Sequence, residues 1–272
     1  NAFEYCTGLA SVTIGNSVTS IGNNAFQNCT SLTSVIIPNS VVSIGFSAFY
    51  YCKNLISIEI PNSVLTIGYA AFGYCTSLTS ITIPNSITSI GELTFYGCNL
   101  TSVVVESGNK YYDSRENCNA IIETATNTLI QGSKTTIIPN SVTGIGRSAF
   151  SGCSGLISID VPNSVTSIGE QAFRYCSGLT SVTIPNSVTS IGGRAFSDCS
   201  SLSSIKLPWK RPLSVPSETF YNVDKSKCTL YVPKGTETLY WVAPVWSEFT
   251  NIVEYDEPED VSYYITINGL EG

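Results

Sequence analysis

The chain has 272 residues, of which 43% are hydrophobic and 12% charged, and its formal net charge at pH 7 is -7. This composition is atypical of a disordered chain, and the acidic balance offers no basic stripe to hold nucleic-acid phosphates. Histidine is absent, which excludes Ser-His-Asp and Cys-His catalytic arrangements and removes the commonest zinc ligand. From the acidic balance we expect no nucleic-acid partner. Because no apolar run is long enough to cross a bilayer, we also expect no membrane span.

A repeated unit organises most of the chain. The stretch IPNSVTSIG at 184–192 has near copies at 37–45, 60–68, 83–91, 138–146 and 161–169. The full unit is L-x-S-V-x-I-P-N-S-V-x-x-I-G-x-x-A-F-x-x-C-x-x, 23 residues long, and its leucine is position 1 below. A fixed period of this length predicts a solenoid in which each unit forms one turn. Since the chain opens inside a unit, at Ala2-Phe3, we expect it to be a fragment or processed piece.

Each part of the unit has a physical interpretation. The apolar residues at positions 1, 4 and 6 predict a short strand with its apolar side chains inward, and proline ends that strand because it cannot donate a hydrogen bond. Asn-Ser predicts a turn, after which Val and Ile face the core. Ala-Phe-x-x-Cys predicts a short helical or 3₁₀ piece with Phe in the interior. We expect the glycines at position 14 to need positive φ; they are Gly22, Gly45, Gly68, Gly91, Gly146, Gly169 and Gly192.

The unit also resembles a known family. L-x-x-V-x-I is similar to the leucine-rich-repeat frame L-x-x-L-x-L, and the whole 23-residue unit resembles the BspA-like leucine-rich repeats of bacterial cell-surface proteins over residues 1–208. The resemblance implies a right-handed leucine-rich-repeat solenoid, mainly β with short helical or 3₁₀ turns and about nine or ten turns long. It also implies a cell-surface or secreted protein that adheres to host or matrix proteins, or to other cells.

The repeat is interrupted once and then degrades. Residues 99–136 depart from the pattern, and CNAIIETATNTLIQG within them predicts two short strands around a polar turn, hence one irregular turn with a hairpin-like excursion. Residues 209–255 are interpreted as a degenerate last turn and a C-terminal cap containing Trp241, Trp246 and Phe249. Residues 256–272 are interpreted as a linker, followed by a strand-like segment, VSYYITING, typical of the start of a further β domain.

The cysteines allow two interpretations. Eight of the ten occupy position 21, namely Cys6, Cys29, Cys52, Cys75, Cys98, Cys153, Cys176 and Cys199. Stacked turns would bring neighbours close enough for disulfides, but parallel side chains favour buried free thiols that act as small apolar residues. Cys118 and Cys228 are out of phase. No spacing indicates a metal site or a cofactor, and Asp113-Ser114-Arg115-Glu116 is interpreted as a plain loop in preference to a calcium site.

Two sets of residues are candidates for binding a partner. Position 5 varies between small serines at position 3 and is expected to face outward on the strands; it holds Thr13, Ile36, Glu59, Thr82, Val104, Asp160, Thr183 and Lys206. Tyrosines before the cysteine form a candidate edge site; they are Tyr5, Tyr51, Tyr74 and Tyr175. The alternatives are a merely solvated strand face and rings that cover the rim of the core.

The favoured function is a non-enzymatic binding scaffold whose partners are extracellular proteins or glycans. One alternative is a structural spacer that displays neighbouring domains, for which substitutions at position 5 would have no effect. A less favoured alternative is a carbohydrate-active enzyme, which needs two acids close together. The acids are scattered, so this alternative requires a pocket that unites a pair such as Glu116 and Glu123.

Overall fold

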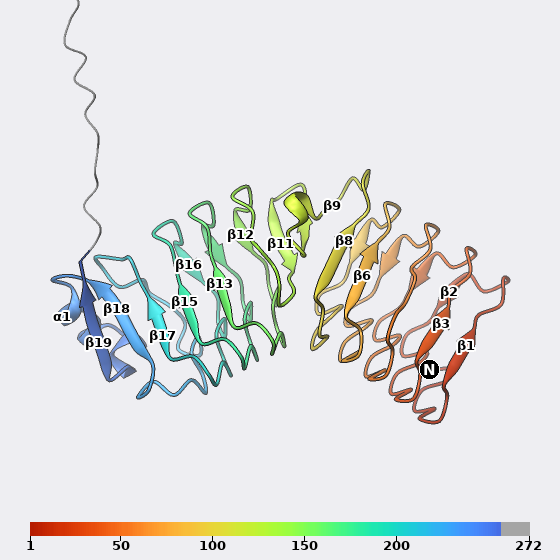
Figure 1. Ribbon diagram of the computed structural model, residues 1–272, viewed down its shortest axis with the longest axis horizontal. Coiled ribbons are helices and arrows are strands. Elements are labelled where there is room, and N and C mark those ends of the chain that lie inside the picture. Colours follow the sequence, from red (N-terminus) through yellow and green to blue (C-terminus); the bar gives the residue numbers. More distant parts are fainter. Residues whose placement is uncertain (257–272) are drawn as a thin grey trace, which may run out of the picture.

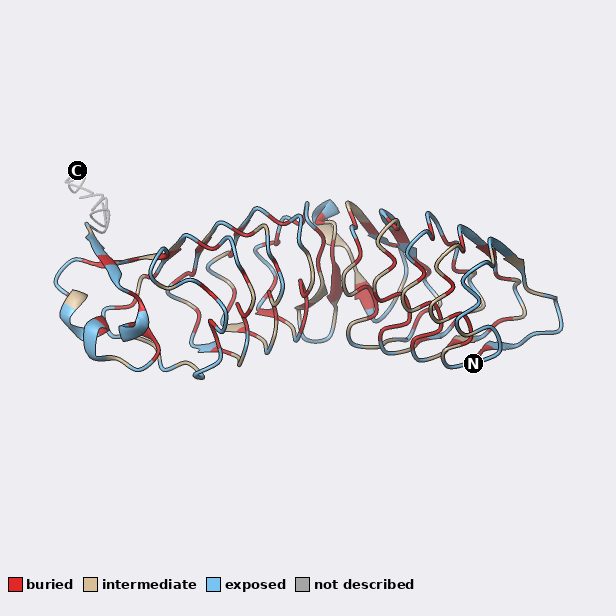
Figure 2. Cartoon of the chain, turned by 90° about the horizontal axis from the view of Figure 1, so that it is seen from below, coloured by how far each residue is buried: buried red, intermediate tan, exposed pale blue. Residues whose placement is uncertain are grey.

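The computed structural model describes residues 1–256 as one elongated, arched stack (Figure 1). It confirms the predicted fold class: the chain is a mainly β solenoid with about 11 turns at a spacing of about 23 residues. The sequence predicted about nine or ten turns, because the last turns have lost most of the repeat pattern. From Ile21 onward, buried residues follow the inside of successive turns (Figure 2), so the core is a narrow column.

The first row of strands carries positions 3 to 5 of each unit. Its members are β1 (Ser11–Thr13), β3 (Ser34–Ile36), β6 (Ser80–Ile83), β8 (Ser102–Val105), β13 (Ser158–Asp160), β15 (Ser181–Thr183), β17 (Ser204–Lys206), β18 (Thr229–Pro233) and β19 (Asn251–Tyr255). They pair in parallel as β1-β3, β6-β8 and β13-β15-β17-β18-β19, and Ser11 lies opposite Ser34, one unit away. No strand is assigned to residues 55–60 or 136–138, so the ladder is open at both places.

A second row follows the Pro-Asn turn. It contains β2 (Ser20–Ile21), β4 (Ser43–Ile44), β5 (Thr66–Ile67), β7 (Ser89–Ile90), β9 (Tyr112–Asp113), β10 (Ile121–Glu123), β11 (Thr128–Gln131), β12 (Gly144–Ile145), β14 (Ser167–Ile168) and β16 (Ser190–Ile191). β2, β4, β5 and β7 form one sheet and the other six form another. β10 and β11 pair antiparallel, which corresponds to the two strands predicted in the irregular stretch.

The irregular stretch divides the core into two halves. One hydrophobic cluster runs from Ile21 to Ile121 and the other from Cys118 to Ile252. The register of β10 shifts between Ile121 and Ile122, and these neighbours belong to different clusters. The hairpin is therefore the junction at which one stack ends and the other begins.

The third side of each turn, Ala-Phe-x-x-Cys, forms successive turns instead of the predicted helical piece. Alternate N–H groups have different partners: Cys29 N–H donates to Phe26 O within the turn (3.2 Å), whereas Asn28 N–H donates to Tyr50 O of the next turn (2.8 Å). The residue before the cysteine has positive φ, as in Asn28 (60°), which prevents a continuous helix. The Phe rings stack inside; those of Phe26 and Phe49, for example, have centroids 5.2 Å apart.

The explanation predicted for the glycines at position 14 is wrong. None of them has positive φ; the positive-φ glycines among the described residues are Gly97, Gly108, Gly152 and Gly235. A Cβ on Gly68 would instead lie 2.6 Å from the carbonyl carbon of Gly45 in the preceding turn. Glycine is needed there because two backbones approach too closely for any side chain.

The cysteines have free thiols, and eight of the ten are buried. They are more than small apolar residues, because thiols at position 21 donate hydrogen bonds to a phenylalanine carbonyl of the preceding turn, which lies 26 residues earlier in the chain. This ladder contains Cys29, Cys52, Cys75, Cys98, Cys176 and Cys199, with S–O distances of 3.1–3.2 Å. Each of these Phe carbonyls also accepts the N–H of the cysteine in its own turn, as Phe26 O does from Cys29, so the thiol is its second hydrogen-bond donor.

The C-terminal segment first adds two strands to the stack and then covers the end of the stack. β18 pairs with β17, and β19 pairs with β18. Trp246 and Phe249 are buried, and the Trp246 indole donates to Leu213 O at 2.7 Å, whereas Trp241 is exposed. The helices of residues 1–256 are η1 (Arg115–Asn117), α1 (Glu237–Val242) and η2 (Trp246–Glu248), and none is long or apolar enough to cross a membrane. The strand-like segment 261–269 lies outside the described residues.

We predict that Gly68→Ala destabilises the protein and that Gly22→Ala does not. The new Cβ at residue 68 would push against the backbone of the preceding turn, at a cost of about 1–3 kcal/mol in the free energy of unfolding. Gly22 occupies the same position in the first complete unit, with nothing within 4 Å of its added Cβ, so we expect a change of less than about 0.5 kcal/mol. Chemical denaturation measures both, and equal effects would contradict the close-approach explanation.

The buried thiols predict a loss of stability at alkaline pH. Burial raises the pKa of Cys52, Cys98 and Cys199 from 9.0 to about 12. The unfolded thiols therefore ionise first, so stability is complete below about pH 9 and falls between about pH 9 and pH 12, at about 1.4 kcal/mol per pH unit for each thiol. Denaturation at about pH 8 and about pH 10.5 tests this. The Cys52→Ala variant should lose stability less steeply; the same slope in both proteins would argue against the assignment.

Candidate functional site

The strand face is the row of side chains at position 5. All eight predicted residues of this face are exposed, as expected for side chains that alternate with buried Val or Ile. Strand pairing places Thr13 opposite Ile36, Thr82 opposite Val104, and Thr183 between Asp160 and Lys206. The face is therefore a regular array of chemically different side chains, and its binding role stays a prediction.

Two depressions lie on this face where the ladder is open. The first has a volume of about 560 Å³ and is lined by residues that include Ser57, Glu59, Thr82 and Glu106. The second, of about 540 Å³, contains Ile137 and Asp160. Neither depression was predicted from the sequence. Residues 55–60 match the repeat as well as the rungs that do form strands, whereas the rung before Pro139 has Thr136 at the position that is Val or Ile in the other rungs.

Acidic side chains meet in a different pair from the one considered. Glu59 and Glu106 line the same depression, and Glu106 Oε2 accepts the backbone N–H of Asn85 at 3.1 Å. Glu123 lines a separate cavity of about 230 Å³, of which Glu116 is not a lining residue. The structure thus does not unite Glu116 with Glu123 in that cavity. Within residues 1–256, no group of three or more Cys, Asp or Glu side chains could hold a metal ion.

The predicted edge tyrosines differ in exposure, and their binding role stays a prediction. Tyr5 is 64% exposed and Tyr175 is 40% exposed, whereas Tyr51 and Tyr74 are half-buried. The rings of Tyr51 and Tyr74 pack with centroids 5.4 Å apart, and the Tyr74 and Tyr96 hydroxyls lie 3.1 Å apart. Tyr51 and Tyr74 thus belong to a cluster in the first half, while Tyr175 lies in the second half with the Arg174 guanidinium 4.5 Å from its ring centroid.

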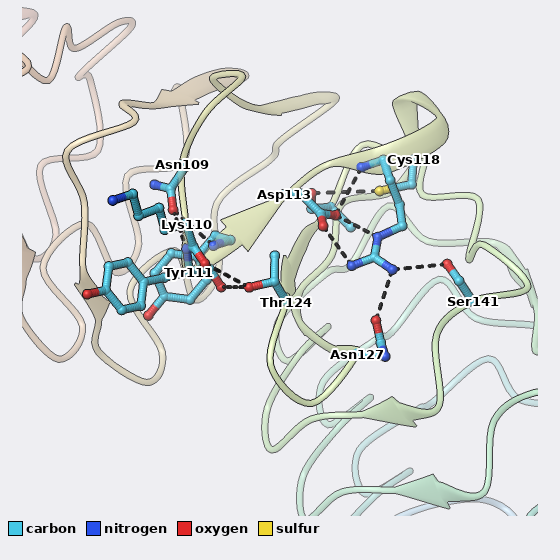
Figure 3. A network of polar contacts seen from close by, with 11 residues as sticks. Asn109, Lys110, Tyr111, Asp113, Cys118, Thr124, Asn127 and Ser141 are labelled. Carbon is cyan, nitrogen blue, oxygen red and sulfur yellow. Dashed lines mark hydrogen bonds and ion pairs between the residues drawn. The ribbon is translucent and has the colours of Figure 1, made fainter.

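At the junction, side chains replace the hydrogen bonds that a regular turn would provide. Asn109 Nδ2 donates to Pro84 O (2.9 Å) and Ile87 O (3.0 Å). Its Oδ1 accepts the N–H groups of Tyr111 (Figure 3) and Tyr112, both at 2.9 Å. The Tyr112 hydroxyl accepts the N–H of Ile90 at 3.2 Å. These groups close the end of the first half.

The predicted loop Asp113-Ser114-Arg115-Glu116 connects to the second half. Arg115 binds Asp113 through Nε (2.8 Å) and a terminal nitrogen (2.6 Å), and its other terminal nitrogen donates to Asn127 Oδ1 (2.9 Å) and Ser141 Oγ (3.3 Å) (Figure 3). Asp113 raises the pKa of Arg115. The Asp113 carboxylate thus orients an arginine that bridges the junction.

Comparisons with known proteins agree with this architecture. A family model described as the BspA type leucine rich repeat region matches residues 1–121 and 130–240 in six copies. No curated protein matches the chain.

Solved structures with similar folds include three repeat proteins. A leucine-rich repeat protein from Bacteroides ovatus has 26% identity and a TM-score of 0.62, over 93% of this chain and 63% of that one. One from Eubacterium ventriosum has 26% identity and a TM-score of 0.65, over 83% and 66% of the two chains. The pneumococcal vaccine antigen PcpA has 18% identity and a TM-score of 0.58, over 91% and 80%. The chain thus spans slightly less than two thirds of the length of the first two.

Proposed function

The chain belongs to the BspA-type leucine-rich repeat family, and from this membership we propose that it is a non-enzymatic binding scaffold at the cell surface or secreted. Its role in this proposal is adhesion to host or matrix proteins or to other cells, through the extended strand face. The observation that carries the proposal is the exposure of all eight side chains at position 5 of successive turns. A preformed surface binds with little ordering cost, so many weak contacts can add up.

Charge suggests which part of a partner the strand face receives. Glu59 and Glu106 line the first depression and Asp160 lines the second, and the lining of neither contains a Lys or Arg. An extended segment carrying Lys or Arg side chains would complement both depressions. We therefore favour a basic protein segment over an acidic one as the partner of this face.

The spacer alternative has support of its own. The two halves together form an elongated body (Figure 1), and such a body would hold neighbouring domains apart even if its faces bound nothing. The enzymatic alternative draws less support, because Glu59 and Glu106 share an open depression without histidine in the chain. The binding experiment described below distinguishes a binding scaffold from a spacer.

The test is direct binding of the protein to arrays of matrix proteins, plasma proteins and glycans, beside the Glu59→Lys, Asp160→Lys double variant. We expect saturable binding to a protein with a basic segment, weakened at least about tenfold in the double variant and by added salt. Glu218→Lys is a control, since Glu218 is exposed outside the strands of this face and should not affect binding.

Other results would redirect the assignment. Undiminished binding by the double variant would place the site outside the strand face. Binding lost equally in Glu218→Lys would indicate a general charge effect. Absence of binding to any array member would favour the spacer.

A further inference from the structure

A groove on the third side of the first half is separate from the strand face. Its lining residues Tyr50 and Tyr96 pack against Tyr74 of the predicted tyrosine edge. The groove has a volume of about 430 Å³ and draws lining residues from five consecutive turns, from Glu4 in the first to Tyr96 in the last. Turns stack about 4.8 Å apart, so the groove extends roughly 19 Å along the solenoid. We propose that this groove binds a neutral oligosaccharide.

Aromatic rings form two of its walls. Phe46 and Tyr69, at position 15 of adjacent turns, stack with centroids 5.5 Å apart and ring planes 10° apart. They nevertheless remain 45% and 43% exposed. Tyr50 and Tyr96, at position 19, also line the groove. Between these rows the position-16 residues Ser47 and Ala70 are small and buried, so the floor is open to a flat ligand.

The fold itself does not require aromatic residues at position 15. In the second half the same position holds Arg147, Glu170 and Gly193. Arg147 forms ion pairs with Glu170 at 3.3 Å and, across the junction, with Glu92 of the first half at 3.6 Å. Since charged residues and glycine occupy this position in equally regular turns, the exposed rings of the first half add nothing that stacking needs. A concentrated exposed aromatic patch indicates a surface for a ligand.

The polar groups of the groove decide between ligand classes. Glu4, Asn24 and Gln27 line it beside the rings, and their side chains carry carboxylate and amide oxygens that accept hydrogen bonds. Acceptors of this kind need a ligand rich in donors. Sugar hydroxyls provide donors while the C–H faces of sugar rings stack on aromatic rings, whereas a proline-rich peptide, the other ligand of aromatic grooves, lacks most N–H donors.

The charge and the length of the groove further restrict the class of ligand that fits it. No lining residue of the groove is basic, and Glu4 is acidic, so a sialylated or sulfated chain would meet an unfavourable field. A groove that crosses five turns is longer than one sugar ring. A neutral linear oligosaccharide therefore fits the groove best.

The experiment is calorimetric titration with neutral linear hexasaccharides of glucose, mannose, galactose and N-acetylglucosamine, beside sialylated glycans and a proline-rich peptide. The proposal expects saturable binding of a neutral hexasaccharide. A Phe46→Asn, Tyr69→Glu double variant should weaken it at least about tenfold. Both new residues already occupy position 15 in this chain, as Asn23 and Glu92, so the variant should fold; circular dichroism checks this. Tyr221→Asn removes an exposed tyrosine elsewhere and should leave binding unchanged.

A second measurement needs no substitution. In an NMR experiment on the unaltered protein, magnetisation should transfer from the aromatic protons of the groove to the ring protons of the bound sugar. Failure of every neutral hexasaccharide to bind, undiminished binding by the double variant, or preference for the sialylated glycan or the peptide would overturn the proposal. The Glu59→Lys, Asp160→Lys variant should bind the sugar normally, so failure here and failure of the strand-face proposal are distinguishable.

Discussion

Each turn of this protein must satisfy the polar groups and cover the apolar groups of the turns on either side. Ser63 Oγ donates to Val41 O at 2.7 Å, Cys52 Sγ donates to Phe26 O at 3.1 Å, and the Phe49 ring stacks between those of Phe26 and Phe72. All of these contacts link equivalent parts of different units. A change in one turn would leave a group without its partner in the next, so the repeated sequence follows from stacking itself.

The same constraint separates structural positions from free ones. Positions that point inward or touch the next backbone are fixed, whereas positions 5 and 15 point outward and vary. The two halves have used this freedom differently. The first half carries exposed rings at Phe46 and Tyr69, and the second half carries ion pairs around Arg147. One scaffold can therefore present several unrelated surfaces without a change in its core.

The junction shows what happens when the repeat is interrupted. Asn109 and Tyr112 supply side-chain groups where a regular turn would supply backbone or serine groups, and Arg115 reaches to Ser141 in the second half. The hydrogen bonds are kept but the ring stack is not continuous, since the stacked pairs end at Phe95 and resume at Phe150. A break in periodicity is thus tolerated where polar groups still find partners.

The sequence alone determined the features that depend on period and alternation. The 23-residue turn, the inward Phe, the outward residues of position 5 and the two strands around Ala-Thr-Asn-Thr all follow from local pattern, because each unit meets the same surroundings. Only the tertiary structure decided how residues one or more units apart lie together. It showed that Gly68 is fixed by the backbone of the preceding turn and not by its own φ, that Glu59 and Glu106 share a depression, and that Phe46 and Tyr69 line one groove. These relations depend on how closely neighbouring turns approach and on where the ladder opens, and no local pattern in the chain encodes those distances.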